Sequence, residues 1–248
     1  MWVSKAAQRL DRSDDGAQLA LFGAIASRDR PEIVRRLDAA PALASRPIRI
    51  GASRQDPGPY FIAAICHYVY AGDTALHVAA AAHQRELCKT LLALGADVHA
   101  RNRRGGEPIH YAADGSPGAD YSDRARQSEV IAYLIEAGAD PDAMDDSGVA
   151  PLHRAVRTRS SDAVSTLIEH GANPLLMNKS GSTPLHLAVQ HTGKSNSGSD
   201  AAKEQQRRII ALLREHGASP IDVDAKGKTV AAAVSSDWIR RLLDSPLT

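Results

Sequence analysis

Aromatic residues are scarce in this chain of 248 residues, where Phe, Trp and Tyr together make up only 4%. Hydrophobic residues still account for 43%, so a core can form, but it must be built mainly from Ala and Leu. Such small aliphatic side chains suit thin helices that stack closely. The composition therefore favours stacked helices over a fold built around large aromatic side chains.

The sequence also lacks abundant cysteine, an excess of one charge and long apolar runs. Cys66 and Cys88 are the only cysteines, too few for a disulfide-rich secreted scaffold, so we expect a reducing, cytoplasmic location. Lys plus Arg number 30 against 29 for Asp plus Glu, and a net charge of +1 offers no basic field for nucleic acid. The longest apolar stretch, residues 60–71, is too short to span a membrane. The start of the chain shows no apolar run of the kind found in secretory signals.

Motifs for catalysis or metal binding are not found in the sequence. There is no nucleophile elbow, no zinc-protease helix and no phosphate-binding loop, so we expect neither an enzyme nor a bound cofactor. His186 with His191, or Cys66 with His67, could share a metal only by chance, because no further ligands stand at a structural zinc spacing. The sequence therefore predicts no metal site.

One short sequence recurs four times and organises most of the chain. It reads TALHVAA at Thr74–Ala80, EPIHYAA at Glu107–Ala113, APLHRAV at Ala150–Val156 and TPLHLAV at Thr183–Val189. Its histidines are 33, 43 and 33 residues apart: His77, His110, His153 and His186. A proline in three of the copies can start a helix, because the N–H group that proline lacks would have no partner within the helix at its first position. The following helices are expected to end at four glycines, Gly95, Gly138, Gly171 and Gly217.

This pattern resembles the ankyrin repeat, which has a period of about 33 residues. The resemblance implies an all-α solenoid of stacked helix-turn-helix units with β-turn fingers, in about six repeats including degenerate caps. We expect a tail at 1–16, a degenerate capping repeat at 17–44, an insertion with an aromatic segment at 45–71, four repeats at 72–223 with two inter-helix insertions, and a capping repeat with a tail at 224–248. The Ala- and Arg-rich composition suggests a bacterial protein of this family. By the same resemblance, each repeat histidine hydrogen-bonds neighbouring backbone.

Three segments interrupt the regular repeats. Residues 115–127 and 192–203 are rich in turn formers and charge, so we interpret both as loops between the two helices of a repeat. Residues 60–70 hold four of the ten aromatic residues and predict an extra helix or strand-like plug, or else an aromatic anchor for a partner. The plug interpretation predicts that five apolar side chains are mostly buried: Tyr60, Phe61, Ile62, Ile65 and Val69.

The resemblance also implies a function, the binding of another protein on the concave face formed by finger tips and first helices. The tips carry five basic residues, Arg103, Arg104, Lys179, Lys226 and Lys228, against Asp73 and Asp146, so we expect a partner with an acidic surface. No nucleic acid or membrane is expected, and the protein is expected to be a monomer. The repeat register gives these candidate partner-binding residues: Tyr70, Arg103, Arg104, Tyr111, Asp114, Asp146, Arg154, Arg157, Lys179, Gln190, His191, Lys226 and Lys228.

Two other classes of function remain open at this point. A small anionic ligand could bind in a pocket formed by Arg154, Arg157, Tyr111 and the loop from Gly115, provided that a cavity of ~300–1,000 Å³ lies beside them. An enzyme could be contained in the inserted segments, although loops of ~15 residues without an activated nucleophile pair disfavour it.

Overall fold

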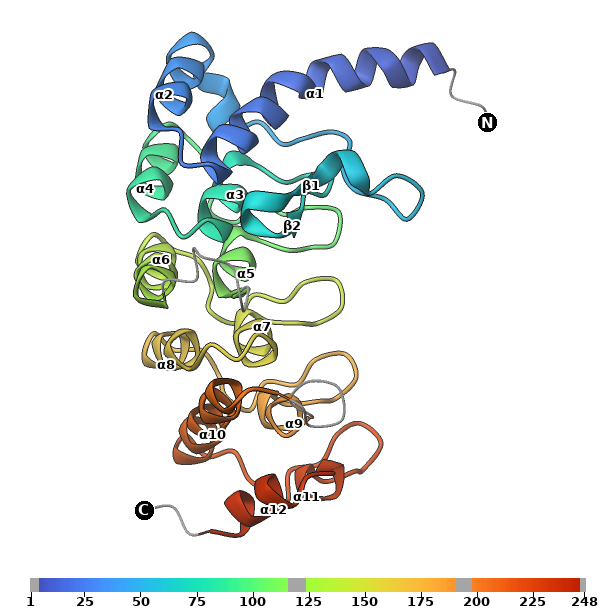
Figure 1. The fold of residues 1–248 in the computed structure, drawn as a ribbon, viewed down its shortest axis with the longest axis vertical. Helices are drawn as coiled ribbons and strands as arrows, with labels where there is room; N and C mark the ends of the chain where they lie inside the picture. The colour runs from blue at the N-terminus through green and yellow to red at the C-terminus, as the bar shows by residue number, and fades with distance from the viewer. Residues whose placement is uncertain (1–4, 116–123, 191–197, 246–248) are drawn as a thin grey trace. The chain divides into compact units, whose positions relative to one another are not determined.

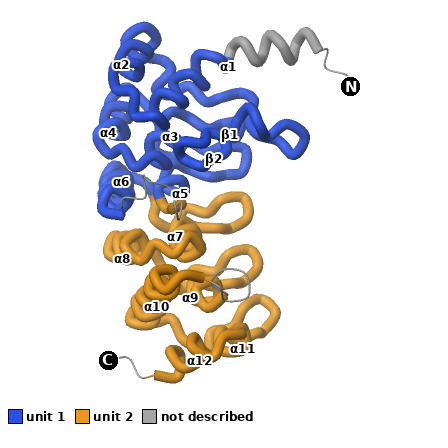
Figure 2. The backbone as a smooth tube through the Cα atoms, viewed as in Figure 1, with its two compact units in different colours: residues 1–112, 118–139 blue, residues 113–117, 140–248 orange. Residues whose placement is uncertain are grey.

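A computed structural model of the chain describes residues 5–115, 124–190 and 198–245, with side chains from Asp15 onward. The chain divides into two compact units (Figure 2). Unit 1 comprises residues 1–112 and 118–139, and unit 2 comprises residues 113–117 and 140–248. Each unit has its own stack of paired helices.

Unit 1 is built from three helix pairs (Figure 1). Its helices are α1 (Lys5–Ala26), α2 (Arg30–Ala39), α3 (Ala75–Ala81), α4 (Arg85–Ala93), α5 (Pro108–Ala113) and α6 (Arg124–Glu136). Helix α3 packs on α1 and α4, and α4 packs on α6. Apolar residues at helical spacing make these contacts, and Leu76, Leu91 and Ile131 are completely buried. The predicted helix-turn-helix units are therefore present.

The N-terminal tail predicted at 1–16 is wrong from Lys5 onward, because α1 begins there. Gly16 lies inside this helix and does not end it. The buried carboxylate of Asp15 accepts hydrogen bonds from the backbone N–H groups of Arg49, at 3.0 Å, and Ile50, at 2.8 Å. These bonds tie the segment that follows the capping repeat to α1.

The aromatic insertion forms a two-stranded antiparallel hairpin, so the predicted strand-like form is confirmed, and the aromatic anchor for a partner stays a prediction. Its elements are η2 (Gly58–Tyr60), β1 (Phe61–Ile62), η3 (Ala63–Ile65) and β2 (His67–Tyr68), where η denotes a 3₁₀ helix. The burial prediction is correct for Tyr60, Ile65 and Val69, whereas Ile62 is half-buried. The prediction is wrong for Phe61, which is 43% exposed. Phe61 pairs across the strands with Tyr68 on the solvent side, because a strand alternates its faces with period two.

Unit 2 continues the same construction with α7 (Pro151–Arg157), α8 (Ser161–Glu169), α9 (Pro184–Ala188), α10 (Asp200–Glu215), α11 (Val230–Ala233) and α12 (Asp237–Asp244). Helix α7 packs on α8 and α9, and α10 packs on both α8 and α9. Within this unit α7 and α9 lie in one layer and α8 and α10 in the other (Figure 1). The first helices of these repeats start with proline, as predicted.

The two predicted inter-helix loops are shorter than expected, because α6 already begins at Arg124 and α10 at Asp200. A buried glutamine in each of these helices contacts the helix that precedes it. Gln127 donates a hydrogen bond to the Ala112 carbonyl at 2.9 Å, and Gln206 donates one to the Ala188 carbonyl at 2.6 Å. Each bond joins the second helix to the end of the first. Residues 116–123 and 191–197 lie outside the described part of the chain.

Each finger is closed by an Asn or Asp whose carbonyl or carboxylate oxygen accepts two backbone N–H groups further along the loop. The closing residues are Asn102, Asp145, Asn178 and Asp224. A glycine with positive φ follows three residues later. At Gly181, for example, φ is +73° and an added Cβ would lie 2.2 Å from the Ala225 nitrogen, so no other residue fits without strain. The fingers are thus rigid mounts for their tip residues.

Candidate partner-binding site

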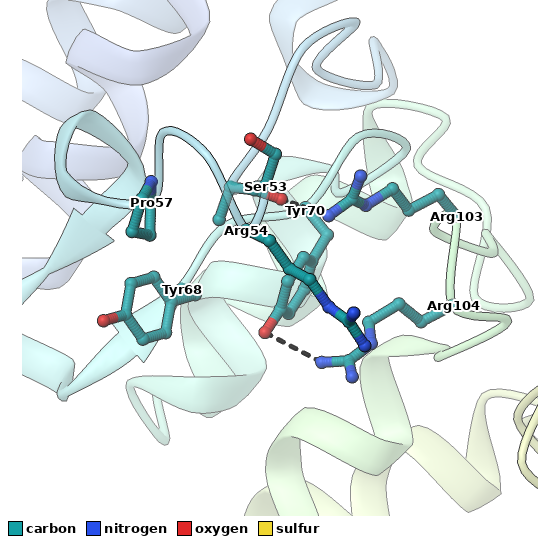
Figure 3. Close-up of a pocket in the computed structure, with 8 residues that line it drawn as sticks. Ser53, Arg54, Pro57, Tyr68, Tyr70, Arg103 and Arg104 are labelled. Carbon is teal, nitrogen blue, oxygen red and sulfur yellow. Dashed lines mark hydrogen bonds between the residues drawn. The ribbon is translucent and has the colours of Figure 1, made fainter.

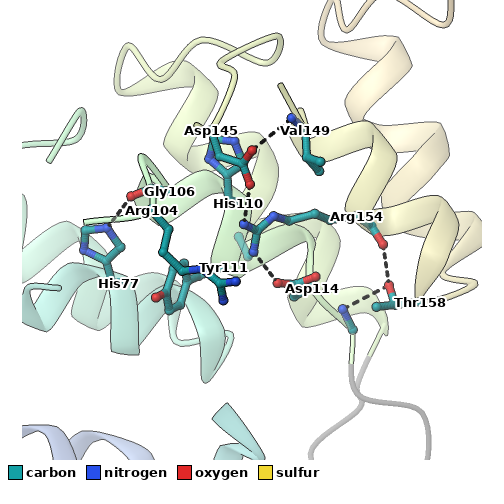
Figure 4. A network of polar contacts seen from close by, with 12 residues as sticks. His77, Arg104, Gly106, His110, Tyr111, Asp114, Asp145, Val149, Arg154 and Thr158 are labelled. Atoms are coloured by element: carbon teal, nitrogen blue, oxygen red, sulfur yellow. Dashed lines mark hydrogen bonds and ion pairs between the residues drawn. The ribbon is translucent and has the colours of Figure 1, made fainter. Parts of the chain in front are cut away.

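The repeat histidines connect the fingers to the helices. In unit 1 the His77 Nδ1 accepts the Thr74 N–H at 3.1 Å, and its Nε2 lies 3.1 Å from the Gly106 carbonyl oxygen (Figure 4). A backbone amide always donates, so the proton of the neutral ring lies on Nε2. In unit 2 His153 and His186 repeat this arrangement toward the carbonyl groups of Ser182 and Lys228. The predicted pairing of these histidines with backbone is confirmed.

Burial sets the protonation of these rings. His77, His110 and His153 are completely buried, and burial lowers the pKa of His77 and His153 below the ordinary value of 6.5. Neutral rings keep Nδ1 free to accept. Among the described residues, no three His, Cys, Asp or Glu side chains are grouped closely enough to hold a metal ion.

Three predicted site residues of unit 1 meet at the finger tips. Arg104 Nη1 donates to the Tyr70 hydroxyl at 2.9 Å, and its guanidinium lies 4.8 Å from the centre of the Tyr70 ring (Figure 3). The guanidinium of Arg103 lies 5.5 Å from the same ring and donates to the Ala52 carbonyl. Both arginines are exposed and Tyr70 is half-buried. We call Tyr70, Arg103 and Arg104 the tip cluster.

A buried polar network holds the backbone of this cluster. The Asp73 carboxylate accepts the Tyr70 N–H at 2.6 Å, the Asn102 side-chain amide at 2.9 Å and the Tyr111 hydroxyl at 2.8 Å. Asn102 in turn accepts the Arg104 N–H at 2.9 Å. Because Asp73 and Asn102 are themselves bonded, Tyr70 and Arg104 are fixed relative to each other.

This network corrects two of the sequence assignments. Tyr111 is only 3% exposed, so the prediction that it contacts a partner is wrong. Its hydroxyl is used inside the network, and its ring packs against His77 with 5.0 Å between centroids. Asp73 is also buried and adds no acidic group to the tips.

The tip cluster lines a cavity of about 450 Å³. Five further residues complete the lining, and all come from the insertion that precedes the cluster: Ala52, Ser53, Arg54, Pro57 and Tyr68. We call this cavity the basic pocket. None of these five was predicted as a site residue, because the irregular insertion has no repeat register from which positions can be inferred. The density of Arg and Tyr in the insertion was the only available signal.

The arginines of the basic pocket carry uncompensated charge. Among the described residues, Arg54, Arg103 and Arg104 form no ion pair with a carboxylate. Arg101, two residues before Arg103, differs in this respect because its guanidinium lies 3.3 Å from the Glu107 carboxylate. The pocket is therefore a local concentration of positive charge in a chain whose net charge is only +1.

Comparisons with known proteins identify the repeats. A family model described as ankyrin repeats in three copies matches residues 121–198, and a model of the single ankyrin repeat matches residues 71–103 and 180–228. These matches cover most of the segment that carries the recurring histidines. The chain is an ankyrin repeat protein. No curated protein matches its sequence. Ankyrin repeats generally serve as protein-protein interaction modules and are typically not catalytic.

In unit 2 of this ankyrin repeat protein, the Arg154 side chain forms ion pairs with two carboxylates of the same unit. Its side chain is 18% exposed and lies 2.6 Å from the Asp114 carboxylate and 3.0 Å from that of Asp145 (Figure 4). Burial alone would lower the pKa of Arg154, but the two carboxylates raise it. Two negative charges already compensate the guanidinium. Arg154 and Asp114 therefore contact each other, and the predicted small-anion pocket loses Arg154 and Tyr111, two of the three side chains expected to form it.

The remaining predicted residues of the ankyrin repeat protein lie on the surface of unit 2. Asp146, Arg157, Lys179, Gln190, Lys226 and Lys228 are exposed. Lys179 donates to the Asp146 carbonyl, and Arg157 with Gln190 borders a cavity of about 200 Å³. His191 lies outside the described residues. Among the described helices, none combines the length and apolarity needed to cross a bilayer.

Proposed function

We propose that this ankyrin repeat protein binds another protein through its finger tips and first helices, with the tip cluster as the energetic centre of the contact. The observation that carries the proposal is the pre-ordered contact of Tyr70 with Arg103 and Arg104. Arg and Tyr are the residue types most enriched among the residues that dominate binding energy. Here they lie on two successive fingers of unit 1 that are held by buried hydrogen bonds.

Pre-ordering matters because binding must otherwise order long side chains. Immobilising a flexible side chain costs about 0.5–1.5 kcal/mol on association. Stacking on the Tyr70 ring already restricts Arg104, whose hydrogen bond to the Tyr70 hydroxyl fixes the end of the side chain. A partner therefore meets two arginines whose ordering has largely taken place in the free protein.

Charge indicates the kind of partner. In unit 1 the exposed tips carry Arg103 and Arg104, and in unit 2 they carry Lys179, Lys226 and Lys228 against the exposed carboxylate of Asp146. The tips of each unit, taken by itself, are complementary to an acidic protein surface, and such complementarity also raises the association rate. We further propose that the protein is a monomer and that it is cytoplasmic; its two free cysteines, Cys66 and Cys88, support the cytoplasmic location.

Affinity capture with three immobilised forms of the full chain tests the proposal. The first is the wild type, and the second is Arg103→Glu/Arg104→Glu. The third, Lys89→Glu/Arg124→Glu, makes the same change in net charge at two exposed positions on α4 and α6 of the same unit. We expect one protein to be retained by the wild type and by the control but lost from the tip variant. Equal retention by all three forms would contradict the assignment of the tip cluster.

A further inference from the structure

We propose that the basic pocket receives a phosphotyrosine side chain of the partner protein. This inference rests on the proposed function and specifies the chemical group that the tip cluster recognises. The feature behind it is the convergence of Arg54, Arg103 and Arg104 on one cavity that also has an apolar wall.

The charge of the pocket calls for a group with more than one negative charge. Three guanidinium groups line it, and among the described residues none of them is paired with a carboxylate. A partner aspartate or glutamate brings one negative charge, whereas a phosphorylated side chain brings about 1.5–2 and three acceptor oxygens. Guanidinium groups match phosphate in a bidentate geometry. Phosphate is therefore the better complement to three arginines.

The donors of the pocket are partly positioned and partly available. Arg103 and Arg104 each use one N–H group in a hydrogen bond, to the Ala52 carbonyl and the Tyr70 hydroxyl respectively. An arginine has five N–H donors, so both keep several for a ligand. Arg54 is exposed, makes no hydrogen bond to a described residue, and points from the insertion toward the other two (Figure 3). It can close over a bound phosphate.

The shape of the pocket favours an aromatic ring between the phosphate and the partner backbone. Pro57 and Tyr68 line the side away from Arg103 and Arg104 (Figure 3). The Tyr68 ring is supported by Phe61, whose ring centre is 4.8 Å away. A cavity of about 450 Å³ is larger than a phosphate group alone requires. A phosphotyrosine ring can lie on this apolar wall while its phosphate reaches the arginines.

Among the molecules that could supply the phosphate group, a protein segment fits the pocket best. The three arginines are exposed, so the pocket is open to solvent and admits a side chain attached to a larger chain. Nucleic acid would need many phosphate contacts spread over a surface, typically ~6–10, whereas this site offers three cations converging on one point. The pocket thus binds in the manner of an arginine cluster that recognises a single phosphorylated residue.

Peptide libraries bound to the immobilised full chain test this inference. Each library has randomised flanks around one fixed central residue, which is phosphotyrosine, tyrosine, phosphoserine or glutamate. We expect retention of the phosphotyrosine library alone. The best peptide is then titrated by fluorescence anisotropy, and we expect Arg54→Ala and Arg104→Ala each to weaken it at least tenfold. Arg124→Ala, an exposed arginine of the same unit outside the pocket, should leave it unchanged.

Each alternative outcome has a definite meaning. Equal retention of the glutamate library would overturn the assignment of phosphate, and equal retention of phosphoserine would overturn the role of the aromatic ring. Free phenyl phosphate binding as tightly as the peptide would show a small-molecule site and overturn the protein source. If no library is retained while the tip variant still loses the captured partner, this inference fails and the proposed function stands.

Discussion

The hydroxyl of Tyr111 provides the sharpest test of the network that mounts the tip cluster. In Tyr111→Phe the ring remains, but the Asp73 carboxylate loses a donor at 2.8 Å and the Asn102 amide loses an acceptor at 2.9 Å. Hydrogen bonds to charged groups contribute about 1.5–3 kcal/mol, and the network is buried, so water cannot replace the lost partner. We expect the free energy of unfolding to fall by about 2–3 kcal/mol and Tm by roughly 4–10 °C.

Urea denaturation followed by circular dichroism measures this change, and Tyr133→Phe is the matched control. Tyr133 lies in the same unit, and its hydroxyl makes no hydrogen bond to a described residue, so its loss should change the unfolding free energy by less than about 0.5 kcal/mol. Partner binding by Tyr111→Phe under folded conditions should weaken only modestly. If Tyr111→Phe is as stable as the wild type but binds the partner much more weakly, Tyr111 contacts the partner directly. That result would refute the stabilising role of the hydrogen-bond network.

Three further predictions concern stability. Burial lowers the pKa of His153 below 6.5, so the unfolded chain binds a proton that the folded chain does not. Stability is therefore full above pH 6.5 and falls below it, by at most about 1.4 kcal/mol per pH unit, and His153→Gln should show a smaller fall between pH 7 and 5.5 in urea titrations. Gly181→Ala should cost about 1–3 kcal/mol because φ is +73°, whereas Gly23→Ala, in open space inside α1, should raise Tm; equal effects would contradict the finger geometry. Arg154→Met should lower the unfolding free energy by about 2 kcal/mol or more, measured by thermal melting, and an unchanged Tm would contradict its pairing with Asp114 and Asp145.

The regular part of the fold could be predicted because each recurring residue of the repeat has a local structural role. Proline at 151 and 184 begins a helix, glycine at 171 and 217 ends one, and the histidines bond to backbone three residues away. The repeat register predicts that Tyr70 lies beside Arg103 and Arg104, and the contacts between these side chains confirm it.

The register could not tell which polar residues point inward. Tyr111 and Asp73 occupy positions that face a partner in a regular repeat, but here the Tyr111 hydroxyl donates a buried hydrogen bond to the Asp73 carboxylate. The insertion lacked a register altogether. Its hairpin depends on contacts distant in sequence, such as the Ala52 N–H to the Val69 carbonyl at 2.7 Å, and no local pattern encodes them. Arg54 and Tyr68 were therefore missed.

Calorimetric titration of the captured partner into the purified wild type, Arg103→Glu/Arg104→Glu and Lys89→Glu/Arg124→Glu tests the central claim most directly. Like charges placed against an acidic partner cost several kcal/mol, so we expect the tip variant to raise Kd at least about 30-fold. The control should change Kd by less than about threefold, and circular dichroism should show that both variants are folded at the titration temperature. Equal Kd values for the tip variant and the wild type would contradict the claim that the tip cluster is the centre of the binding surface.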